Sequence, residues 1–565
     1  MPSRTSTAPA SGRRRRGVAA LALVVLALVA GAVRAEDDDA GEEGEAPEQV
    51  VGKRLFEEPR FSQWFAAHAR GDANAPFGDG DPTVATLATP DGAIAGPFAG
   101  QAMSCRQCHL VGDAAALPGG GSRAYGDFAR RSPIPPRDDG RTTAPRNSPV
   151  LVGAGVARAH GTPFILHFDG EFPSTAALVR GTLTGRNYGW LPREQAQAVA
   201  HVAAVIRGDD GSGALARKGG GPYRRVLAGT DPTLPPELRL PKRFRIDVDR
   251  AGDAQVLDAV ARLVAAYVDG LAFAADDGGF AGSPYDRFLA KNVLPRRPVS
   301  HEPTRVYVER LRLLLARLDG PAFVEDGIDG SFRLHAHPFR FGPAELEGLR
   351  VFLDPRRGNC VACHPPPAFT DFRAHDTGVA QLDYDRVHGA GAFAALPIPS
   401  ATARLASPDA WLPASPRHPD AAEPFRDVVR AGAPGRTDLG LWNLLQNPDH
   451  DDPRLQRRLR RLVCAPLGPM SRCRRLAPTP DALLARAVAL FKTPTLRDLG
   501  HSAPYLHTGA ADTLDDVVAQ YRQVATLQRA GLLRNGDRHL ARIRLDDGDA
   551  AALVAYLRAL DEDYD

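Results

Sequence analysis

Cysteine is scarce in this chain, and the few cysteines form a repeated pattern. The 565 residues include 6 Cys and 3 Met, and four of the cysteines form two Cys-x-x-Cys-His runs, "CRQCH" and "CVACH". A zinc site would need two further ligands at short spacing beside each run, and a thioredoxin-like pair would need no fixed histidine. The pattern instead predicts c-type haem attachment, in which two thiols bond to the porphyrin and the adjacent imidazole binds the iron. The predicted attachment residues are Cys105, Cys108, His109, Cys360, Cys363 and His364.

Long apolar runs are also scarce, because the run at residues 18–33 has no counterpart later in the chain. It follows Arg13 to Arg16, and Val33-Arg34-Ala35 places small residues where a signal peptide is cleaved. We therefore expect a signal peptide over residues 1–35, in agreement with haem attachment outside the cytoplasm. An uncleaved anchor is the alternative, although the run is short for a membrane span. The mature protein is expected to be soluble and periplasmic, with no transmembrane segment.

Neither sign of charge dominates the chain. The formal net charge is +3, and the predicted signal contributes six arginines and no acidic residue, so the mature chain is near −3. No basic patch indicates a nucleic-acid partner. Glycine (55 residues) and proline (49 residues) are abundant instead, which is typical of long ordered loops around short helices.

Two cysteines, Cys464 and Cys473, lie outside the haem runs. They are close together in a chain that we expect to be exported, which favours a disulfide between them. Neither belongs to a Cys-x-x-Cys-His run, so no third haem is expected.

The predicted fold is mainly α-helical, with two cytochrome c-type haem modules, an inserted helical segment and long loops. Helical spacing predicts helices that begin near Pro192 and Pro343, and two amphipathic helices around 254–271 and 306–318. A last helix, within "DAAALVAYLRAL", is expected to pack across the first helix of its module. The predicted segments are a signal peptide (1–35), an acidic disordered leader (36–50), an N-terminal module (51–210), the inserted segment (211–340) and a C-terminal module (341–565).

Several stretches resemble one known family. They are "GKRLFEEPRFS" before the first haem run, "RNSPVLVGAG" and "FDGEF" after it, "CHPPPAFTDFRAHDTGV" at the second run, and "FKTPTLRDLGHSAPYLHTGAADTLDDVVAQY" at residues 491–521. The last stretch is the most specific. With the two haem runs, these stretches are similar to the bacterial di-haem cytochrome c peroxidase and MauG group over about residues 51–560, apart from the inserted segment.

This resemblance implies that the two haems divide the work. The first-module haem, with His109 as its proximal ligand, would bind peroxide or oxygen on an open face. The second-module haem, on His364, would store or relay an electron. The implied function is the reduction of H₂O₂ with electrons from a small redox protein, a cytochrome c or a copper protein. Two alternatives stay open: a MauG-like or rubber-oxygenase-like enzyme that oxidises a protein or organic substrate, and a di-haem electron carrier without catalysis.

The sequence departs from the family at the peroxide pocket. The positions at which the family has Trp, Gln and Glu read Phe168, Leu178 and Tyr188 here. The usual acid/base group for O–O cleavage is therefore missing from its place. Candidates to replace it are Tyr188, Glu171 and Glu194, and the alternative for each is an ordinary packed or surface side chain.

The axial ligands also depart from the family peroxidases. Residues 110–159 contain no His and no Met, so the reactive haem is expected to have an open face without prior reduction. At the second haem the resemblance places the sixth ligand at Tyr521, counted from His507, where peroxidases have Met and MauG has Tyr. A phenolate is a hard, anionic donor that favours ferric iron, so this haem should have a low potential. The alternative is that Tyr521 only packs on its helix.

The resemblance finally implies a Ca²⁺ ion between the modules. The matching residues are Asn147, Ser502 and Pro504. Ca²⁺ needs six to eight oxygens, and backbone carbonyls with water would have to supply most of them, since Asn147 is the only side-chain ligand.

Overall fold

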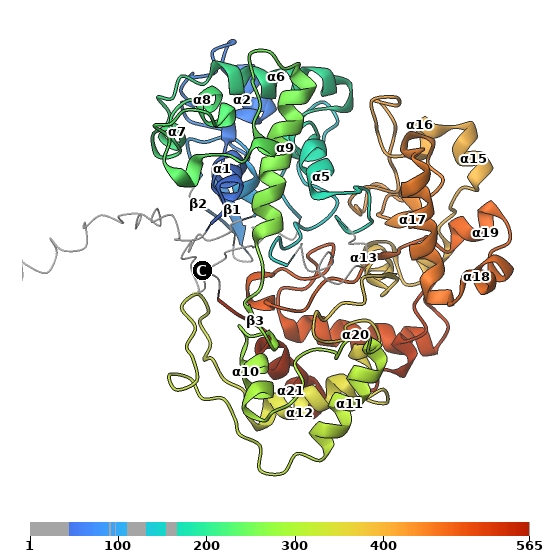
Figure 1. Cartoon of the computed structure of the whole chain (residues 1–565). Helices are drawn as coiled ribbons and strands as arrows, with labels where there is room; N and C mark the ends of the chain where they lie inside the picture. Colours follow the sequence, from blue (N-terminus) through green and yellow to red (C-terminus); the bar gives the residue numbers. More distant parts are fainter. Residues whose placement is uncertain (1–44, 90–91, 96–97, 110–130, 154–165, 564–565) are drawn as a thin grey trace, which may run out of the picture. The chain divides into compact units, whose positions relative to one another are not determined.

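The computed structural model describes residues 45–89, 92–95, 98–109, 131–153 and 166–563. The predicted signal peptide and most of the predicted leader lie outside these residues. From Ala46 onward the chain is mainly helical, with only short two-stranded sheets among the described residues, which confirms the predicted fold class (Figure 1). Within the described part of the chain, every helix is too short or too polar to span a bilayer.

In the N-terminal half, the first helix packs against a helix that follows about 200 residues later. Helix α1 (Pro47–Phe56) begins with Pro47 and has Glu48 in its first turn, where the proline ring and the acidic charge favour a helix start. Its first turn thus includes residues that the sequence assigned to the leader. Helix α9 (Asp253–Gly270) packs along α1 (Figure 1). Gly52 makes this close crossing possible, because a Cβ atom there would lie 2.2 Å from the Leu263 carbonyl oxygen.

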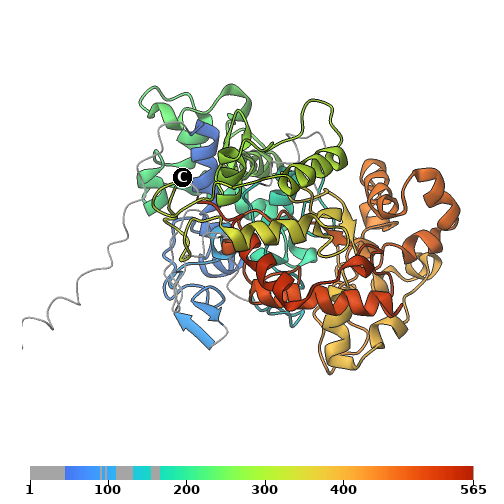
Figure 2. The ribbon, with the colours of Figure 1, turned by 90° about the horizontal axis from the view of Figure 1, so that it is seen from below.

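A second pair of the same kind is formed by α12 (Pro343–Leu353) and α21 (Asp547–Arg558), which lie side by side (Figures 1 and 2). Gly348 stands at the crossing, where a Cβ atom would lie 2.0 Å from the Ala552 carbonyl oxygen. This pair confirms the expectation that the last helix packs across the first helix of its module.

The segment predicted as an insertion contributes to both helical cores. Helix α9 belongs to the core around α1, whereas α10 (Pro284–Lys291) and α11 (Thr304–Ala316) share the core of α12 and α21. Their buried faces hold Phe288 and Leu311, which are fully buried. The segment therefore follows the two helix pairs rather than forming a core of its own.

The remaining elements are short and connected by long loops, as the glycine and proline content predicts. The other helices are α2 (Gln63–His68), α3 (Cys105–Cys108), α5 (Thr175–Leu183), α6 (Gln195–Gly208), α7 (Ala214–Lys218), α8 (Tyr223–Ala228), α13 (Val379–His388), α14 (Ala392–Ala395), α15 (Ala401–Ala406), α16 (Pro408–Trp411), α17 (Pro453–Cys464), α18 (Met470–Leu476), α19 (Pro480–Ala485) and α20 (Leu514–Arg529). The antiparallel strand pairs are β1 (Thr86–Thr89) with β2 (Gly92–Ala95), β3 (Ala275–Asp276) with β4 (Gly279–Phe280), and β5 (Ala374–His375) with β6 (Phe491–Lys492).

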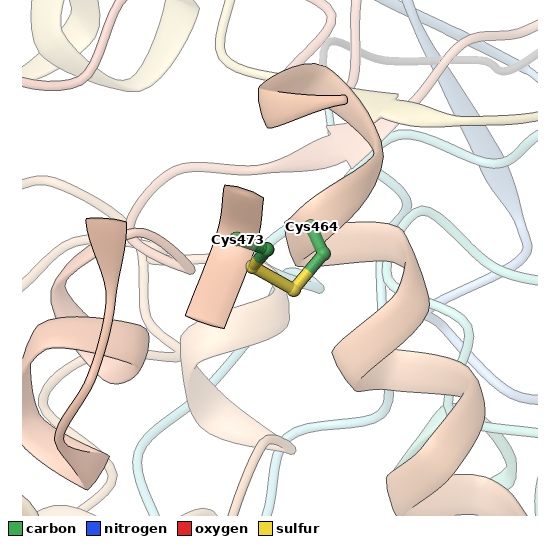
Figure 3. Close-up of a disulfide and its surroundings, with 2 residues drawn as sticks. All are labelled: Cys464 and Cys473. Atoms are coloured by element: carbon green, nitrogen blue, oxygen red, sulfur yellow. A yellow bond between two sulfur atoms is a disulfide. The ribbon is translucent and has the colours of Figure 1, made fainter. Parts of the chain in front are cut away.

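A disulfide connects α17 to α18. Figure 3 shows Cys464 at the end of α17 bonded to Cys473 in α18, with a Cα–Cα distance of 5.4 Å. Both cysteines are buried in the core around Trp442. The predicted disulfide is confirmed.

Candidate haem sites

The second Cys-x-x-Cys-His run follows α12 in a tight turn. Gly358 folds against the Val351 carbonyl, and Asn359 adopts a left-handed conformation (φ 51°) that starts the 3-10 turn Cys360–Ala362. The Nδ1 atom of His364 donates a hydrogen bond to the Phe369 carbonyl, 2.9 Å away. A backbone carbonyl only accepts, so this bond leaves the Nε2 lone pair available for a metal, as in most haem-ligating histidines. Burial lowers the pKa of His364, which favours the neutral imidazole that binds iron.

This run opens into a largely apolar cavity of about 260 Å³. The cavity is lined by the two cysteines and the histidine of the run and by many side chains from α20, α21 and the loops between them. Apolar lining residues include Phe352, Leu499, Val518, Leu540, Leu553 and Leu557. Two thiols, one oriented imidazole and an apolar surround are the set that a covalent c-type haem requires, so the residues present fit the group.

Tyr521, which the family resemblance implies as the sixth ligand, lines this same cavity. It comes from α20, and burial together with the sulfur atoms of Cys363 and Cys360 raises the pKa of its phenol. The phenol is thus protonated on its own, and would become a phenolate only where a metal replaces the proton.

The cavity also holds two histidines whose placement the sequence did not predict. His507 stacks on Phe491 at a ring distance of 3.6 Å, its Nε2 atom is buried without a hydrogen-bond partner among the described residues, and burial lowers its pKa to about 3. His375 bonds Asp537 at 2.6 Å and Asp371 at 2.9 Å. Both histidines belong to stretches that carry the family resemblance. That resemblance was the sequence feature that could have indicated their place near the second run.

The first Cys-x-x-Cys-His run forms α3, and the residues that follow it (110–130) lie outside the described chain. Ser104 begins the helix, and its backbone N–H donates to the Gln107 side chain at 2.6 Å. Burial lowers the pKa of His109 to about 4, helped by nearby His167 and opposed by the Pro149 carbonyl. His109 is therefore neutral at physiological pH, as an iron ligand must be.

The first thiol of each run is unsuited to redox exchange. Burial raises the pKa of Cys105 to about 11 and that of Cys360 to about 12. A redox Cys-x-x-Cys pair needs a lowered thiol pKa, because the thiolate is the nucleophile. The raised pKa values of Cys105 and Cys360 therefore disfavour the thioredoxin-like alternative.

The structure brings one of the three acid/base candidates to a haem run. The Tyr188 hydroxyl lies 3.1 Å from the Cys105 sulfur, and the side chain is 2% exposed. Burial, and then the charge of a Cys105 thiolate, raises the pKa of Tyr188. Tyr188 is therefore a neutral phenol that can donate a proton but does not act as a base at neutral pH.

The two glutamates are held in ion pairs. Glu171 pairs with Arg426 at 2.5 Å and with His167 at 3.4 Å, and Glu194 pairs with Arg137 at 2.5 Å. Burial would raise the pKa of each carboxyl, but the arginine partners outweigh it and the net pKa is lowered in both. Both glutamates are thus ionised, and neither lines the described cavity at the second run.

Pro149 lies close to both runs, and Phe168 lies at the second one. Pro149 acts on the His109 imidazole and also lines the second cavity, and Phe168 lines that cavity beside Lys492, whose amine lies 5.5 Å from the phenyl ring. Leu178, the third departing position, belongs to α5. Pro149 is therefore shared by the surroundings of His109 and the lining of the second cavity.

The predicted calcium residues all line the second cavity. The side-chain amide of Asn147 contacts the Pro504 carbonyl and approaches the Leu506 carbonyl at 3.5 Å, and the Asn147 Oδ1 atom is buried without a hydrogen-bond partner among the described residues. The Ser502 hydroxyl instead donates to the Asp498 carbonyl at 2.9 Å. Several oxygens thus meet near Asn147, and the Ser502 side chain is directed elsewhere.

No protein-family model matches the chain, but individual proteins do. The protein named cytochrome-c peroxidase IdrP2 of Denitromonas iodatirespirans is 25% identical over 220 residues, which are 38% of this chain and 39% of that relative. The protein of the same name from Pseudomonas sp. (strain SCT) is 40% identical over 78 residues, 14% of this chain and 19% of the relative. The chain thus spans less than half the length of the curated relatives that it matches.

Solved structures of two proteins align over most of the chain. One is a MauG-like protein associated with microbial copper homeostasis, with 16% identity, a TM-score of 0.43 and coverage of 92% of this chain and 90% of the other. The second is the diheme peroxidase BthA from Burkholderia thailandensis E264, with 17% identity, a TM-score of 0.41 and coverage of 92% and 86%.

Proposed function

We propose that this chain, a member of the di-haem peroxidase and MauG family, is an exported di-haem c-type oxidoreductase that reduces H₂O₂ to water in the periplasm. The observation that supports this most is the pair of Cys-x-x-Cys-His runs, each with a partly buried histidine whose pKa is lowered by burial, with Pro149 beside His109 and in the lining of the second cavity. Reduction of H₂O₂ to two water molecules takes two electrons and two protons. Two haems held by these runs would supply the two electrons, and a small cytochrome c or copper protein would replace them.

The residues divide the work as follows. Cys105, Cys108 and His109 would hold the first haem, and Cys360, Cys363 and His364 the second, with Tyr521 as the sixth ligand of the second iron. The His364 imidazole is held in the required tautomer by the Phe369 carbonyl. Packed side chains around the cavity exclude water, which lowers the local dielectric and protects the stored electron from side reactions.

Proton delivery near the first haem would depend on Tyr188. Glu171 and Glu194 are ionised and paired with arginines, so neither holds a proton to give. The Tyr188 phenol holds a proton beside Cys105. A phenol is a weaker acid than the glutamic acid that the family uses, so we expect slow peroxide turnover.

This same observation favours a second candidate function. If peroxide is consumed slowly, oxidising equivalents stay on the protein for longer, and a MauG-like oxidation of a protein or organic substrate becomes possible. An electron carrier without catalysis is the third candidate, and it requires two irons that are six-coordinate in every redox state.

A calcium ion at Asn147 is part of the proposal. The buried Asn147 oxygen and the Pro504 carbonyl would be two of its ligands, with the Ser502 carbonyl and water as others. Removal of Ca²⁺ with a chelator should then lower activity and leave both haems attached, because the thioether bonds do not depend on the ion.

Steady-state assays of the holoprotein separate the three candidates. Peroxide consumption that depends on a reduced cytochrome c or copper-protein donor supports the peroxidase. A long-lived oxidised state after peroxide, without donor-linked turnover, favours the MauG-like enzyme and rejects the peroxidase. No reaction with peroxide in either redox state leaves the carrier.

A further inference from the structure

Away from both haem runs, three histidines and two aspartates gather where three segments meet. His335 and His337 come from the loop before α12, and Asp561 comes from the tail after α21. His501 ends the 3-10 turn Leu499–His501, and Asp498 directly precedes this turn. None of these five side chains lines the second haem cavity or belongs to a Cys-x-x-Cys-His run. Three segments that are distant in the sequence thus bring imidazoles and carboxylates together in one small group, as a metal site requires.

Three ligand atoms of this group point at one spot. The Nε2 atom of His337 lies 2.9 Å from a carboxylate oxygen of Asp561, and the ligand atoms of His335, His337 and Asp561 all lie within 4.8 Å of one another. Gly500 borders this spot. A Cβ atom at this position would lie 2.7 Å from both the His335 Nδ1 atom and the Asp561 Oδ2 atom. A glycine at this position therefore keeps space open beside both ligand atoms.

A second layer of contacts orients two of these ligands, His335 and Asp561. The Nε2 atom of His335 faces an Asp498 oxygen at 3.1 Å and the Glu562 carbonyl at 3.2 Å, both of which only accept. His335 must therefore carry its proton on Nε2, which leaves the Nδ1 lone pair directed at the spot. The other Asp561 oxygen accepts from the Gly500 N–H at 2.9 Å. Metal-bound histidines are typically held in this way by a carboxylate or carbonyl on the second ring nitrogen.

We propose that His335, His337 and Asp561 bind a divalent transition-metal ion, of which Zn²⁺ is the probe. Two neutral imidazoles and one carboxylate suit borderline divalent ions, and Ca²⁺ and Mg²⁺ prefer sites made entirely of oxygen. Three protein ligands leave at least one position for water. Asp498 acts through His335 as a positioning residue, and His501, 2.8 Å from the other Asp498 oxygen, holds that carboxylate in place.

The exposure of the three ligands agrees with an ion that enters from solvent. The side chains of His335 and Asp561 are only 3% and 1% exposed, whereas that of His337 is 30% exposed. His335 and Asp561 therefore form the buried side of the site, and His337 forms the side that faces solvent. A bound ion would fix the C-terminal tail to the loop before α12, next to Leu499 and Ser502, which line the second haem cavity.

Zn²⁺ titration of the holoprotein by calorimetry, after chelator treatment and with Ca²⁺ in excess, tests the site. The wild-type protein should bind one more Zn²⁺ ion than His337→Ala and Asp561→Asn, or each variant should bind it at least about tenfold more weakly. His418→Ala is the matched control. His418 is a similarly exposed histidine that pairs with Asp409 at 2.6 Å, and its removal should leave the Zn²⁺ affinity unchanged.

A second measurement covers the case of a variant that folds poorly. Zn²⁺ should raise the unfolding temperature of the wild-type protein and of His418→Ala, but not that of His337→Ala, whose partly exposed side chain can be removed without opening the core. Equal Zn²⁺ binding and equal thermal shifts in the wild-type protein and in the His337 and Asp561 variants would overturn the proposal. The cluster would then be a chain of hydrogen-bonded imidazoles and carboxylates that binds no metal.

Discussion

Glu58 shows how a single buried charge contributes to stability in the N-terminal half. Its carboxylate receives two hydrogen bonds of 2.7 Å from Arg60 and one of 2.8 Å from the Tyr223 hydroxyl. Burial would raise the pKa of Glu58, but the hydrogen bonds and charge of Arg60 outweigh it and the net pKa falls below the ordinary 4.5. Ionised Glu58 therefore stabilises the fold at any pH above about 4.5, and this stability is lost as the pH falls below that value.

Glu58→Gln should lower the free energy of unfolding by about 3 kcal/mol at pH 7, because it leaves Arg60 buried with one fewer carboxylate. The difference from the wild-type protein should shrink as the pH falls below 4.5. Urea unfolding at several pH values measures it. Glu309→Gln is the control, since Glu309 forms a comparable but exposed pair with Arg312 and should show no such loss. A pH-independent difference would contradict the assigned pKa direction.

Tyr521 and Tyr188 allow a reciprocal test of the two haem sites. Tyr521 lines the second cavity, and Tyr188 contacts Cys105 of the first run. Tyr521→Phe should remove a ligand from the second iron and change only its spectrum and potential, raising the potential because the anionic donor is lost. Tyr188→Phe should leave the second haem unchanged. Identical spectra of Tyr521→Phe and the wild-type protein would show that Tyr521 only packs.

At the residue scale, the two Cys-x-x-Cys-His runs could be predicted from the sequence. The partners that surround the candidate acid/base residues could not. The haem cysteines and histidines are adjacent in the chain, so their pattern is visible without a fold. The ion-pair partner of Glu171 is 255 residues away, and that of Glu194 is 57 residues away. The His335, His337 and Asp561 group likewise exists only after folding, because no local spacing connects its members.

At the scale of elements, glycines at two helix crossings set the architecture. Gly52 and Gly348 each stand where another helix backbone passes within the reach of a Cβ atom. Gly348→Ala should therefore force α12 and α21 apart and lower the free energy of unfolding by about 1 to 3 kcal/mol. Thermal unfolding measures the loss. Gly432→Ala is the control, because its Cβ atom would meet nothing within 4 Å. Equal stability of both variants would contradict the close crossing.

The disulfide between α17 and α18 gives a prediction that also concerns the haems. In the denatured, unreduced holoprotein no thiol should react with a labelling reagent, because the proposed haem attachment would occupy four cysteines and Cys464 and Cys473 are paired. After reduction, Cys464 and Cys473 alone should label. Their replacement by serine should cost about 2 to 3 kcal/mol. Two reactive thiols before reduction would reject the disulfide, and six after reduction would reject haem attachment.

Helix positions were predictable, but the partners of the helices were not. The predicted helix at 254–271 is Asp253–Gly270 in the structure, and the one at 306–318 is Thr304–Ala316. Periodicity shows that a helix has an apolar face and says nothing about which neighbour covers it. For this reason α9 was assigned to an insertion, although it packs on α1 in the way that α21 packs on α12. We propose that the N-terminal module extends to include α9.

At the scale of the whole described chain, a buried arginine joins segments that are far apart in the sequence. Arg146 follows the first run and pairs with Asp169 at 2.6 Å and with Asp438, 292 residues along the chain, at 2.5 Å. It also lies 5.6 Å from the centre of the Phe491 ring, which lines the second cavity. Because Asp169 follows Phe168, these contacts join the Phe168 segment to residues far along the chain. The cooperation of two haems stays a prediction from the family stretches in the sequence.

The central claim is that the two irons have different surroundings: an open face at His109, and His364 with Tyr521 at the second. Electron paramagnetic resonance of the untreated, oxidised holoprotein tests it most directly, because each ferric haem reports its own ligands. We predict one high-spin signal from a five-coordinate haem and one low-spin signal from a His/Tyr haem, in equal amounts. Two low-spin signals, or a bis-His or His/Met signal at either iron, would contradict the account.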